Sequence, residues 1–83
     1  MSTEEDVRQV VLKHLGSRAW GDHLPADLPL GESGAGLDSI ALIEMLLDCE
    51  AVFGVPLVQS LLEDGPVTVE RIAAAVTAAR RSA

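Results

Sequence analysis

One stretch in the middle of the chain restricts the possible folds more than any other. It runs from Ser39 to Phe53, is apolar at most positions and contains no glycine or proline. Asp38 and Ser39 at its start can accept hydrogen bonds from free backbone N–H groups, and Gly54 and Pro56 follow its end. These boundaries predict a helix over about residues 39–53 that buries one face against the rest of the chain.

At 100° per residue, this predicted helix has two distinct faces. The inner face, which we expect in the core, carries Leu42, Met45, Leu46, Cys49 and Phe53. The outer face carries Ile40, Glu44, Leu47 and Ala51, with Asp48 beside them. Two apolar residues are therefore expected among carboxylates on the exposed side, and such a patch is typical of a contact surface. We expect Cys49 to be a small buried apolar residue rather than a reactive thiol.

The rest of the sequence predicts further helices and no strands. Ser2-x-x-Glu5 has capping-box spacing before an apolar pattern with helical period, which predicts a first helix over about residues 4–16. A short helix is expected within residues 57–64, and Thr68 is expected to cap a last helix. The predicted fold is all-α, a single domain over residues 1–83 with three main helices and one short helix.

A long loop, Gly21 to Leu37, separates the first two predicted helices, because its prolines and glycines prevent a sustained helix. Loops of this length usually have packed anchors or a function. We expect the anchors to be Leu24, Leu28, Leu30 and Leu37, with Trp20 covering the core just before them. The pattern Gly31-x-x-Gly34-x-Gly36 lacks the Gly-Lys-Ser/Thr ending and the preceding strand of a nucleotide-binding loop, so we expect no nucleotide site.

Composition and charge argue against several classes of protein. An apolar fraction of 48% is too high for a disordered tail. No apolar run is as long as a membrane span and the acidic N-terminus is no signal sequence, so we expect no membrane association. A single cysteine is compatible with the reducing cytoplasm, where we expect the protein. The net charge of −7, with no Lys or Arg between Arg18 and Arg71, disfavours nucleic-acid binding.

No pattern in the sequence indicates an enzyme. A catalytic serine needs a base within reach, and no histidine follows Ser39 in the chain. His14 lies on the apolar side of the first predicted helix, where we expect a packed or rim position, and His23 lies in the loop. The two histidines lack metal-ligand spacing, so we expect neither catalysis nor a metal site.

A longer string around Ser39 resembles the acyl and peptidyl carrier proteins. It consists of Gly36-Leu37-Asp38-Ser39-Ile40, Glu44 five residues after the serine, and Phe53-Gly54-Val55-Pro56 at the end of the helix. The resemblance covers nearly the whole chain and implies the carrier-protein four-helix bundle. It implies that 4'-phosphopantetheine from coenzyme A is esterified to the Ser39 hydroxyl and holds a biosynthetic intermediate as a thioester. It also implies that Asp38 is recognised by the enzyme that attaches the group.

The resemblance implies a set of partner enzymes. They are a phosphopantetheinyl transferase and acyltransferases, ligases, ketosynthases or other acyl-processing enzymes. The expected docking surface is the outer face of the 39–53 helix, with Ile40, Glu44, Leu47, Asp48 and Ala51. Its carboxylates would meet basic patches on these partners. The free chain is expected to be a monomer.

Two departures from the fatty-acid type narrow the resemblance. Ala41 and Leu42 stand where fatty-acid carriers are commonly more polar, and the Gly34-Ala35-Gly36 spacing is expanded. Both argue against primary fatty-acid synthesis and favour a stand-alone carrier of a specialised polyketide, antibiotic, hybrid or amino-acid-loading pathway. The acidity of the 39–53 helix favours acyl cargo. A peptidyl or aminoacyl carrier is the nearest alternative. The alternative from another class is a small acidic adaptor that binds a partner helix non-covalently, with Ser39 only a helix cap.

Overall fold

The computed structural model describes residues 2–15, 24–63 and 65–82, and in these ranges the chain forms helices and no strands. The helices are α1 (Thr3–Leu15), α3 (Ser39–Phe53), α4 (Val58–Glu63) and α5 (Val69–Ser82). The prediction of an all-α fold is therefore confirmed for the described residues. The expectations for Trp20 and His23 fall outside these residues.

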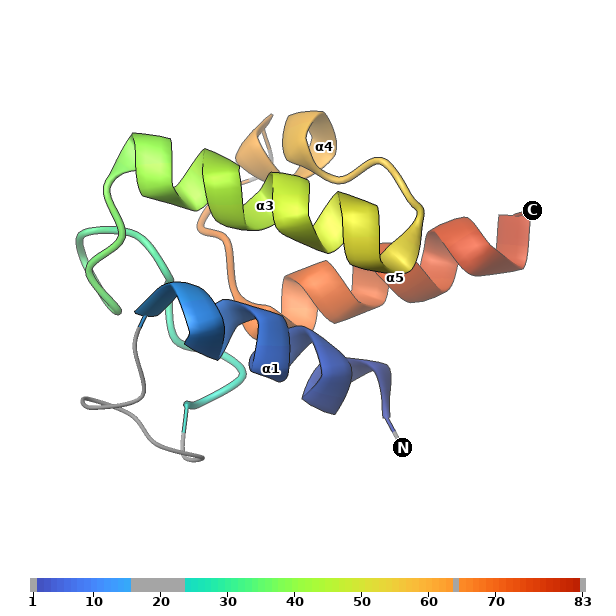
Figure 1. Cartoon of the computed structure of the whole chain (residues 1–83), viewed down its shortest axis with the longest axis horizontal. Helices are drawn as coiled ribbons and strands as arrows, with labels where there is room; N and C mark the ends of the chain where they lie inside the picture. The colour runs from blue at the N-terminus through green and yellow to red at the C-terminus, as the bar shows by residue number, and fades with distance from the viewer. Residues whose placement is uncertain (1, 16–23, 64, 83) are drawn as a thin grey trace.

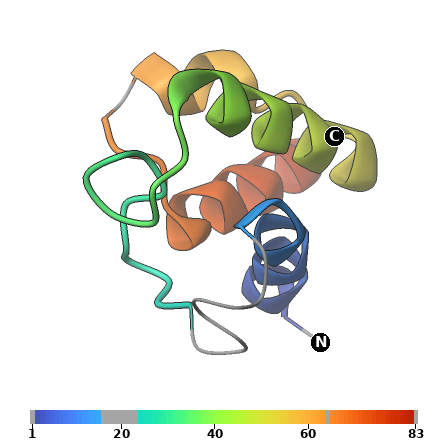
Figure 2. The same cartoon turned by 60° about the vertical axis from the view of Figure 1, so that its left-hand side comes forward.

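Helix α1 packs against both α3 and α5, and the short α4 lies beside α3 (Figures 1 and 2). Side chains from all four helices and from the loop before α3 meet in one core. Fully buried members include Val7 and Val11 of α1, Met45, Leu46 and Cys49 of α3, and Ile72 and Val76 of α5. Burial of this apolar surface is the main force that holds so small a domain together.

The predicted capping residues hold the helix ends. The Ser2 hydroxyl accepts a hydrogen bond from the Glu5 N–H at 3.1 Å, and the Thr68 hydroxyl accepts one from the Arg71 N–H, also at 3.1 Å. At the end of α3, Gly54 adopts the left-handed conformation with φ of 71°, which favours glycine. Short-range sequence signals therefore gave the helix boundaries to within about two residues.

The loop before α3 is anchored as predicted. Leu24, Leu30 and Leu37 are buried and Leu28 is half-buried. The Leu30 N–H donates to the Val67 carbonyl at 2.8 Å, and the Leu37 N–H donates to the Leu30 carbonyl at 3.1 Å. In the turned view the loop passes below the first turn of α3 and beside the start of α5 (Figure 2). This anchoring fixes the point at which the chain enters α3.

Cys49 lies in the core, as its place on the inner face of α3 predicted. Its side chain is fully buried, and its Sγ lies 3.8 Å from the Sδ of Met45. Burial raises the pKa of the Cys49 thiol to about 12, and the charge of the neighbouring Asp48 acts in the same direction. The thiol is therefore protonated near neutral pH and serves as a packing group.

Candidate functional site

Ser39 is the first residue of α3, and its side chain is exposed. Asp38 before it is the N-cap of the helix: its Oδ1 accepts a hydrogen bond from the Ala41 N–H at 2.7 Å. The Asp38 carbonyl accepts the next bond, from the Leu42 N–H at 2.8 Å. Asp38 therefore holds the start of the helix in place, and Ser39 presents its hydroxyl to solvent immediately beside that cap.

The first turn of α3 offers donors for an anion on Ser39. The N–H groups of Ser39 and Ile40 have no acceptor among the residues that the structure describes. Unpaired N–H groups and the positive end of the helix dipole both favour negative charge at this place. These donors and the dipole would favour an anionic group on the Ser39 hydroxyl, while the carboxylate of the capping Asp38 would oppose it.

No histidine lies beside Ser39 within the described ranges, and the carboxylate that precedes it, Asp38, is engaged in capping the helix. The histidine in these ranges, His14, lies with its Nε2 2.9 Å from the Oδ2 of Asp48. Asp48 is nine residues after Ser39 in α3, which is roughly 13 Å along the helix axis. His14 thus holds the partly buried position that was predicted and cannot take a proton from Ser39. A Ser–His pair of the kind that activates a nucleophilic serine is therefore not formed by Ser39 and His14.

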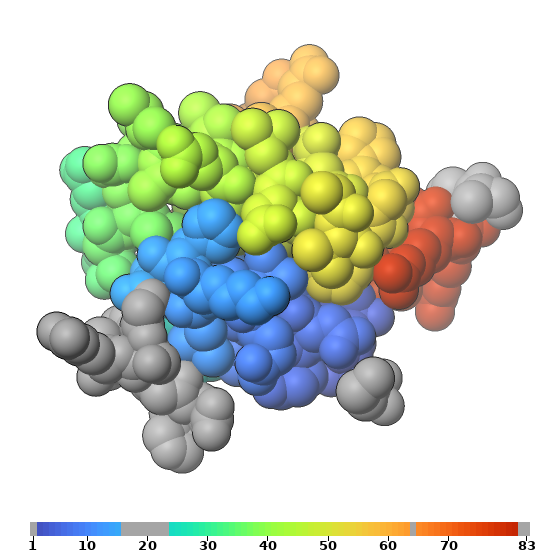
Figure 3. Space-filling model, viewed as in Figure 1, coloured from blue at the N-terminus to red at the C-terminus, as the bar shows by residue number. Residues whose placement is uncertain are grey.

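The outer face of α3 is exposed as predicted. The exposed fraction is 70% for Ile40 and 52% for Leu47, and Glu44 and Ala51 are exposed as well. In the space-filling view, α3 forms the upper part of the surface above α1 (Figure 3). The apolar residues and the carboxylate predicted as a docking surface therefore share one accessible face.

Asp48 differs from the other predicted docking residues, because its carboxylate already contacts a side chain of another helix. Its carboxylate pairs with His14 and thereby links α3 to α1. The pairing joins residues 34 positions apart in the chain, so no local pattern in the sequence could reveal it. Glu44 is consequently the more accessible carboxylate of the face.

Two exposed apolar residues were not assigned by the sequence analysis. Val52 is 57% exposed and Ile43 is 37% exposed. Both lie at the flanks of the helical wheel, between the inner and outer faces, and their angular positions could have identified them. On the inner face, Met45, Leu46 and Cys49 are buried, whereas Leu42 and Phe53 are only half-buried against the core.

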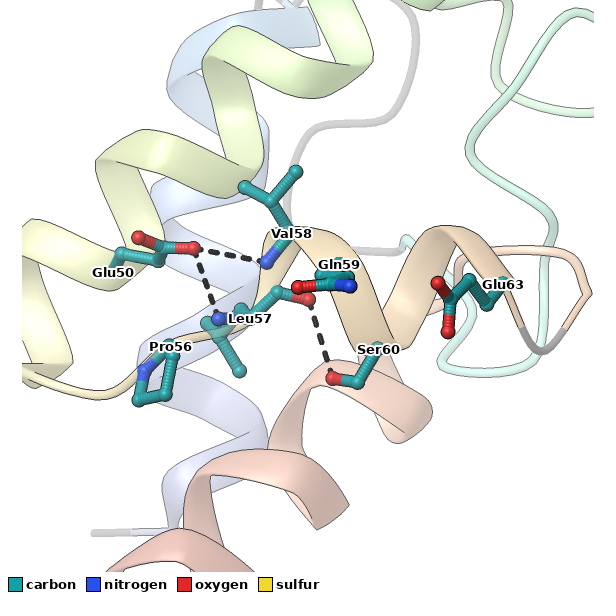
Figure 4. A pocket seen from close by; sticks show the side chains of 7 residues that line it. All are labelled: Glu50, Pro56, Leu57, Val58, Gln59, Ser60 and Glu63. Carbon is teal, nitrogen blue, oxygen red and sulfur yellow. Dashed lines mark hydrogen bonds between the residues drawn. The ribbon is translucent and has the colours of Figure 1, made fainter.

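Glu50 has a structural role that the sequence analysis did not identify. Its Oε2 accepts hydrogen bonds from the N–H groups of Leu57 and Val58, both at 2.9 Å, and so joins the end of α3 to the start of α4 (Figure 4). These bonds, first from Leu57 and then from Val58, hold the pKa of Glu50 below its usual value. A groove of about 500 Å³ lies at this junction and is lined by Glu50, Pro56, Leu57, Val58, Gln59, Ser60 and Glu63.

We expect Glu50→Gln to make stability less dependent on pH in the acidic range. A carboxyl group with a lowered folded-state pKa contributes stability above its unfolded pKa of about 4.3, and that contribution is lost as the pH falls through the folded value. The variant should therefore unfold at lower urea than the wild type at pH 7, and the difference should shrink below about pH 4.3. Urea titrations at pH 7, 5, 4 and 3 measure it. Glu63→Gln removes a charge from the same groove without removing these bonds; an equal effect there would contradict the assignment.

A second hollow lies beside Ser39. It measures about 450 Å³ and is lined by Gly31, Glu32, Ser33, Leu37, Ser39 and Leu42. The loop before α3 supplies most of its wall, and the first turn of α3 supplies the remainder. The exposed serine thus stands at the edge of a surface cavity.

Comparison of the chain with models of known protein families, with characterised proteins and with solved structures finds no match. In the described ranges, none of the helices combines the length and apolar character needed to cross a membrane. Nor do these ranges contain a group of three or more His, Cys, Asp or Glu side chains that could hold a metal ion.

Proposed function

We propose that this chain is a carrier protein, which holds biosynthetic intermediates as thioesters on a 4'-phosphopantetheine arm attached to Ser39. The observation that carries the proposal is the exposed hydroxyl of Ser39 at the start of α3, next to a capping Asp38 and remote from the His14 imidazole. A serine in this setting is accessible to a modifying enzyme, which would supply the base and the metal for the transfer. The sequence string around Ser39 resembles the attachment motif of carrier proteins.

The site fits the proposed group chemically. Attachment forms a phosphodiester, and the N–H groups of Ser39 and Ile40 and the helix dipole favour that negative charge. When bound, the arm supplies the thiol that carries the acyl group. The chain's own part is to hold the attachment point at a rigid helix end and to leave the arm free to reach partner enzymes.

The outer face of α3 supports the same proposal. Ile40 and Leu47 offer apolar contact, and Glu44 offers a negative charge to basic partners. This surface begins one residue after the attachment serine, so a docked enzyme would have the arm within reach. We propose as partners a phosphopantetheinyl transferase and acyl-loading or acyl-processing enzymes such as acyltransferases, ligases and ketosynthases.

Within this class we favour a stand-alone acyl carrier of a specialised polyketide or related pathway, with a peptidyl or aminoacyl carrier as the alternative. The preference for acyl cargo rests on the acidity of α3, and Ala41 and Leu42 after the serine argue against the fatty-acid type. Loading assays with a panel of acyl and aminoacyl donors distinguish the two. If the chain accepts acyl but not aminoacyl groups from matched loading enzymes, it is an acyl carrier. The opposite result would identify a peptidyl or aminoacyl carrier.

One observation favours a function from another class. The apolar side chains of Ile40, Leu47 and Val52 are all more than half exposed on α3, which also suits a non-covalent adaptor. In an adaptor, Ser39 would only be the first residue of α3 and would carry no covalently attached group.

Intact mass separates the carrier from the adaptor. The chain is incubated with coenzyme A and a broad-specificity phosphopantetheinyl transferase, and we expect its mass to increase by one phosphopantetheinyl group. Ser39→Ala should stay folded, because Asp38 still caps α3, and should gain nothing. The matched control Ser60→Ala, also an exposed serine, should be modified like the wild type. No gain in the wild type, or a gain in Ser39→Ala, would overturn the proposal.

For docking, we expect charge and packing variants to act on different rate constants. Glu44→Arg should slow association with a partner enzyme and weaken its dependence on salt, because exposed charges act mainly through screened steering. Leu47→Ala should raise the dissociation rate and leave the salt response nearly unchanged. Transfer kinetics at two ionic strengths measure both, with circular dichroism as the folding control. If neither variant changes the kinetics, the docking surface lies elsewhere, with the exposed Leu62 of α4 as the next candidate.

A further inference from the structure

The hollow beside Ser39 is formed by the loop before α3 and not by the exposed outer face of that helix. Its α3 residues are Ser39 itself and Leu42, which lies on the inner face and packs against the core. The docking residues Ile40 and Glu44 are not part of its wall. A group in this hollow would therefore leave the outer face of α3 uncovered.

The turn that forms the hollow is held in shape by its own backbone. The Gly31 carbonyl accepts hydrogen bonds from the N–H groups of Gly34 and Gly36, at 3.0 and 2.8 Å. The Ala35 N–H donates to the Pro29 carbonyl at 2.9 Å, and Leu37 is buried at the end of the turn. The cavity is thus preformed, which lowers the entropy cost of placing a flexible group in it.

The lining of the hollow is mixed in a way that suits a particular kind of ligand. Leu37 and Leu42 provide apolar surface, Ser33 provides a hydroxyl that both donates and accepts, and Glu32 provides an exposed carboxylate that accepts. Its volume of about 450 Å³ lies within the ~300–1,000 Å³ typical of small-molecule sites. The Glu32 charge disfavours an anion in the hollow and favours a neutral group with N–H and O–H donors.

The pantetheine part of the proposed arm has this chemistry. Beyond its phosphate it carries two methyl groups on one carbon, a hydroxyl and two amides, and it has no charge. The phosphate itself would stay at the N–H groups of the first turn of α3, outside the Glu32 side of the hollow. Ser39 lines the hollow, so an arm on its hydroxyl starts at the cavity edge.

We propose, on the basis of the carrier function proposed above, that the inner part of the pantetheine arm rests in the hollow between the Gly31–Ser33 turn and Leu42. Leu42 and Leu37 would contact the methyl groups, and Ser33 and Glu32 would bind the hydroxyl and amide donors. The resting arm and a docked partner would then occupy different sides of α3. A partner could bind the loaded carrier before the arm leaves the protein surface.

Nuclear magnetic resonance of the apo and modified chains tests this inference. Intact mass first confirms complete modification of the isotope-labelled protein. We then expect nuclear Overhauser effects between the methyl groups of the arm and those of Leu42, and amide shift changes at residues 31–33 as well as next to Ser39. The double variant Glu32→Ala/Ser33→Ala should be modified normally and should lose these contacts. The matched variant Gln59→Ala/Ser60→Ala, in the groove between α3 and α4, should keep them.

The possible outcomes separate the inference from the carrier function. If the chain is modified but shifts are confined to residues 38–41, the arm is free in solvent and the inference is wrong. If the arm contacts residues 58–63 instead, it rests in the groove between α3 and α4, and the inference is again wrong. In both cases the carrier function stands. If the mass does not change at all, both proposals fail.

Discussion

We expect Leu46→Ala to lower the free energy of unfolding by about 2–5 kcal/mol, as large-to-small changes in a packed core do. Leu46 has no exposed surface and lies on the inner face of α3, in the core that α1 and α5 share. Single domains are stable by only about 5–15 kcal/mol, and one of 83 residues falls towards the low end. A urea titration followed by circular dichroism measures the loss.

Leu47→Ala is the matched control for this variant. The two residues are adjacent and chemically identical, but Leu47 is 52% exposed on the outer face of α3. Truncating an exposed side chain usually changes stability by no more than about 0.5 kcal/mol. Similar losses for the two variants would show that the faces of α3 are wrongly assigned. If Leu47→Ala is as stable as the wild type, a change in its docking kinetics can be attributed to the lost contact and not to unfolding.

The sequence predicted α3 well because its signals are local. Asp38 at the start, Gly54 and Pro56 at the end and an apolar stripe between them all agree. The capping bond from the Ala41 N–H to Asp38 depends on residues three apart, which a reader of the sequence can see. These signals alone mark Ser39 only as a residue at a helix start; its role as the candidate attachment point comes from the resemblance of the surrounding string to carrier proteins.

Contacts between distant residues escaped the sequence analysis. No role was predicted for Glu50, yet it caps the start of α4. His14 was expected at a packed or rim position of the first helix, but its pairing with Asp48 depends on how α1 and α3 pack. Side chains of the same type serve different roles according to tertiary neighbours, and spacing along one helix does not contain that information.

The loop before α3 shows the same limit in its glycines. In the sequence, Gly31, Gly34 and Gly36 all predict a loop in the same way, because glycine disfavours a continuous helix. The structure separates them. A Cβ at Gly34 would lie 2.0 Å from the Pro29 carbonyl oxygen, whereas a Cβ at Gly31 would have the Leu37 carbonyl oxygen as its nearest neighbour at 3.9 Å. Only a close approach in space reveals which of the two positions requires glycine.

We therefore expect Gly34→Ala to destabilise the domain by about 3 kcal/mol, at the upper end of the range for overpacking. The added methyl group meets backbone and not a flexible side chain, so the turn itself must move. That movement would break the bonds from Gly34 to Gly31 and from Ala35 to Pro29, which hold the turn. Urea titration against the wild type gives the loss.

Gly31→Ala is the control, because its methyl group has ordinary contact distances and Gly31 is not among the glycines with positive φ. We expect it to be as stable as the wild type or slightly more stable, since alanine restricts the unfolded chain. The same pair tests whether the loop positions the attachment site. Leu37, at the end of the turn, directly precedes Asp38, so a displaced turn should disturb the cap and slow phosphopantetheine transfer to Ser39 in Gly34→Ala alone. Equal stability of the two variants would mean that position 34 does not require glycine. Equal transfer rates would mean that the turn does not set the position of Ser39.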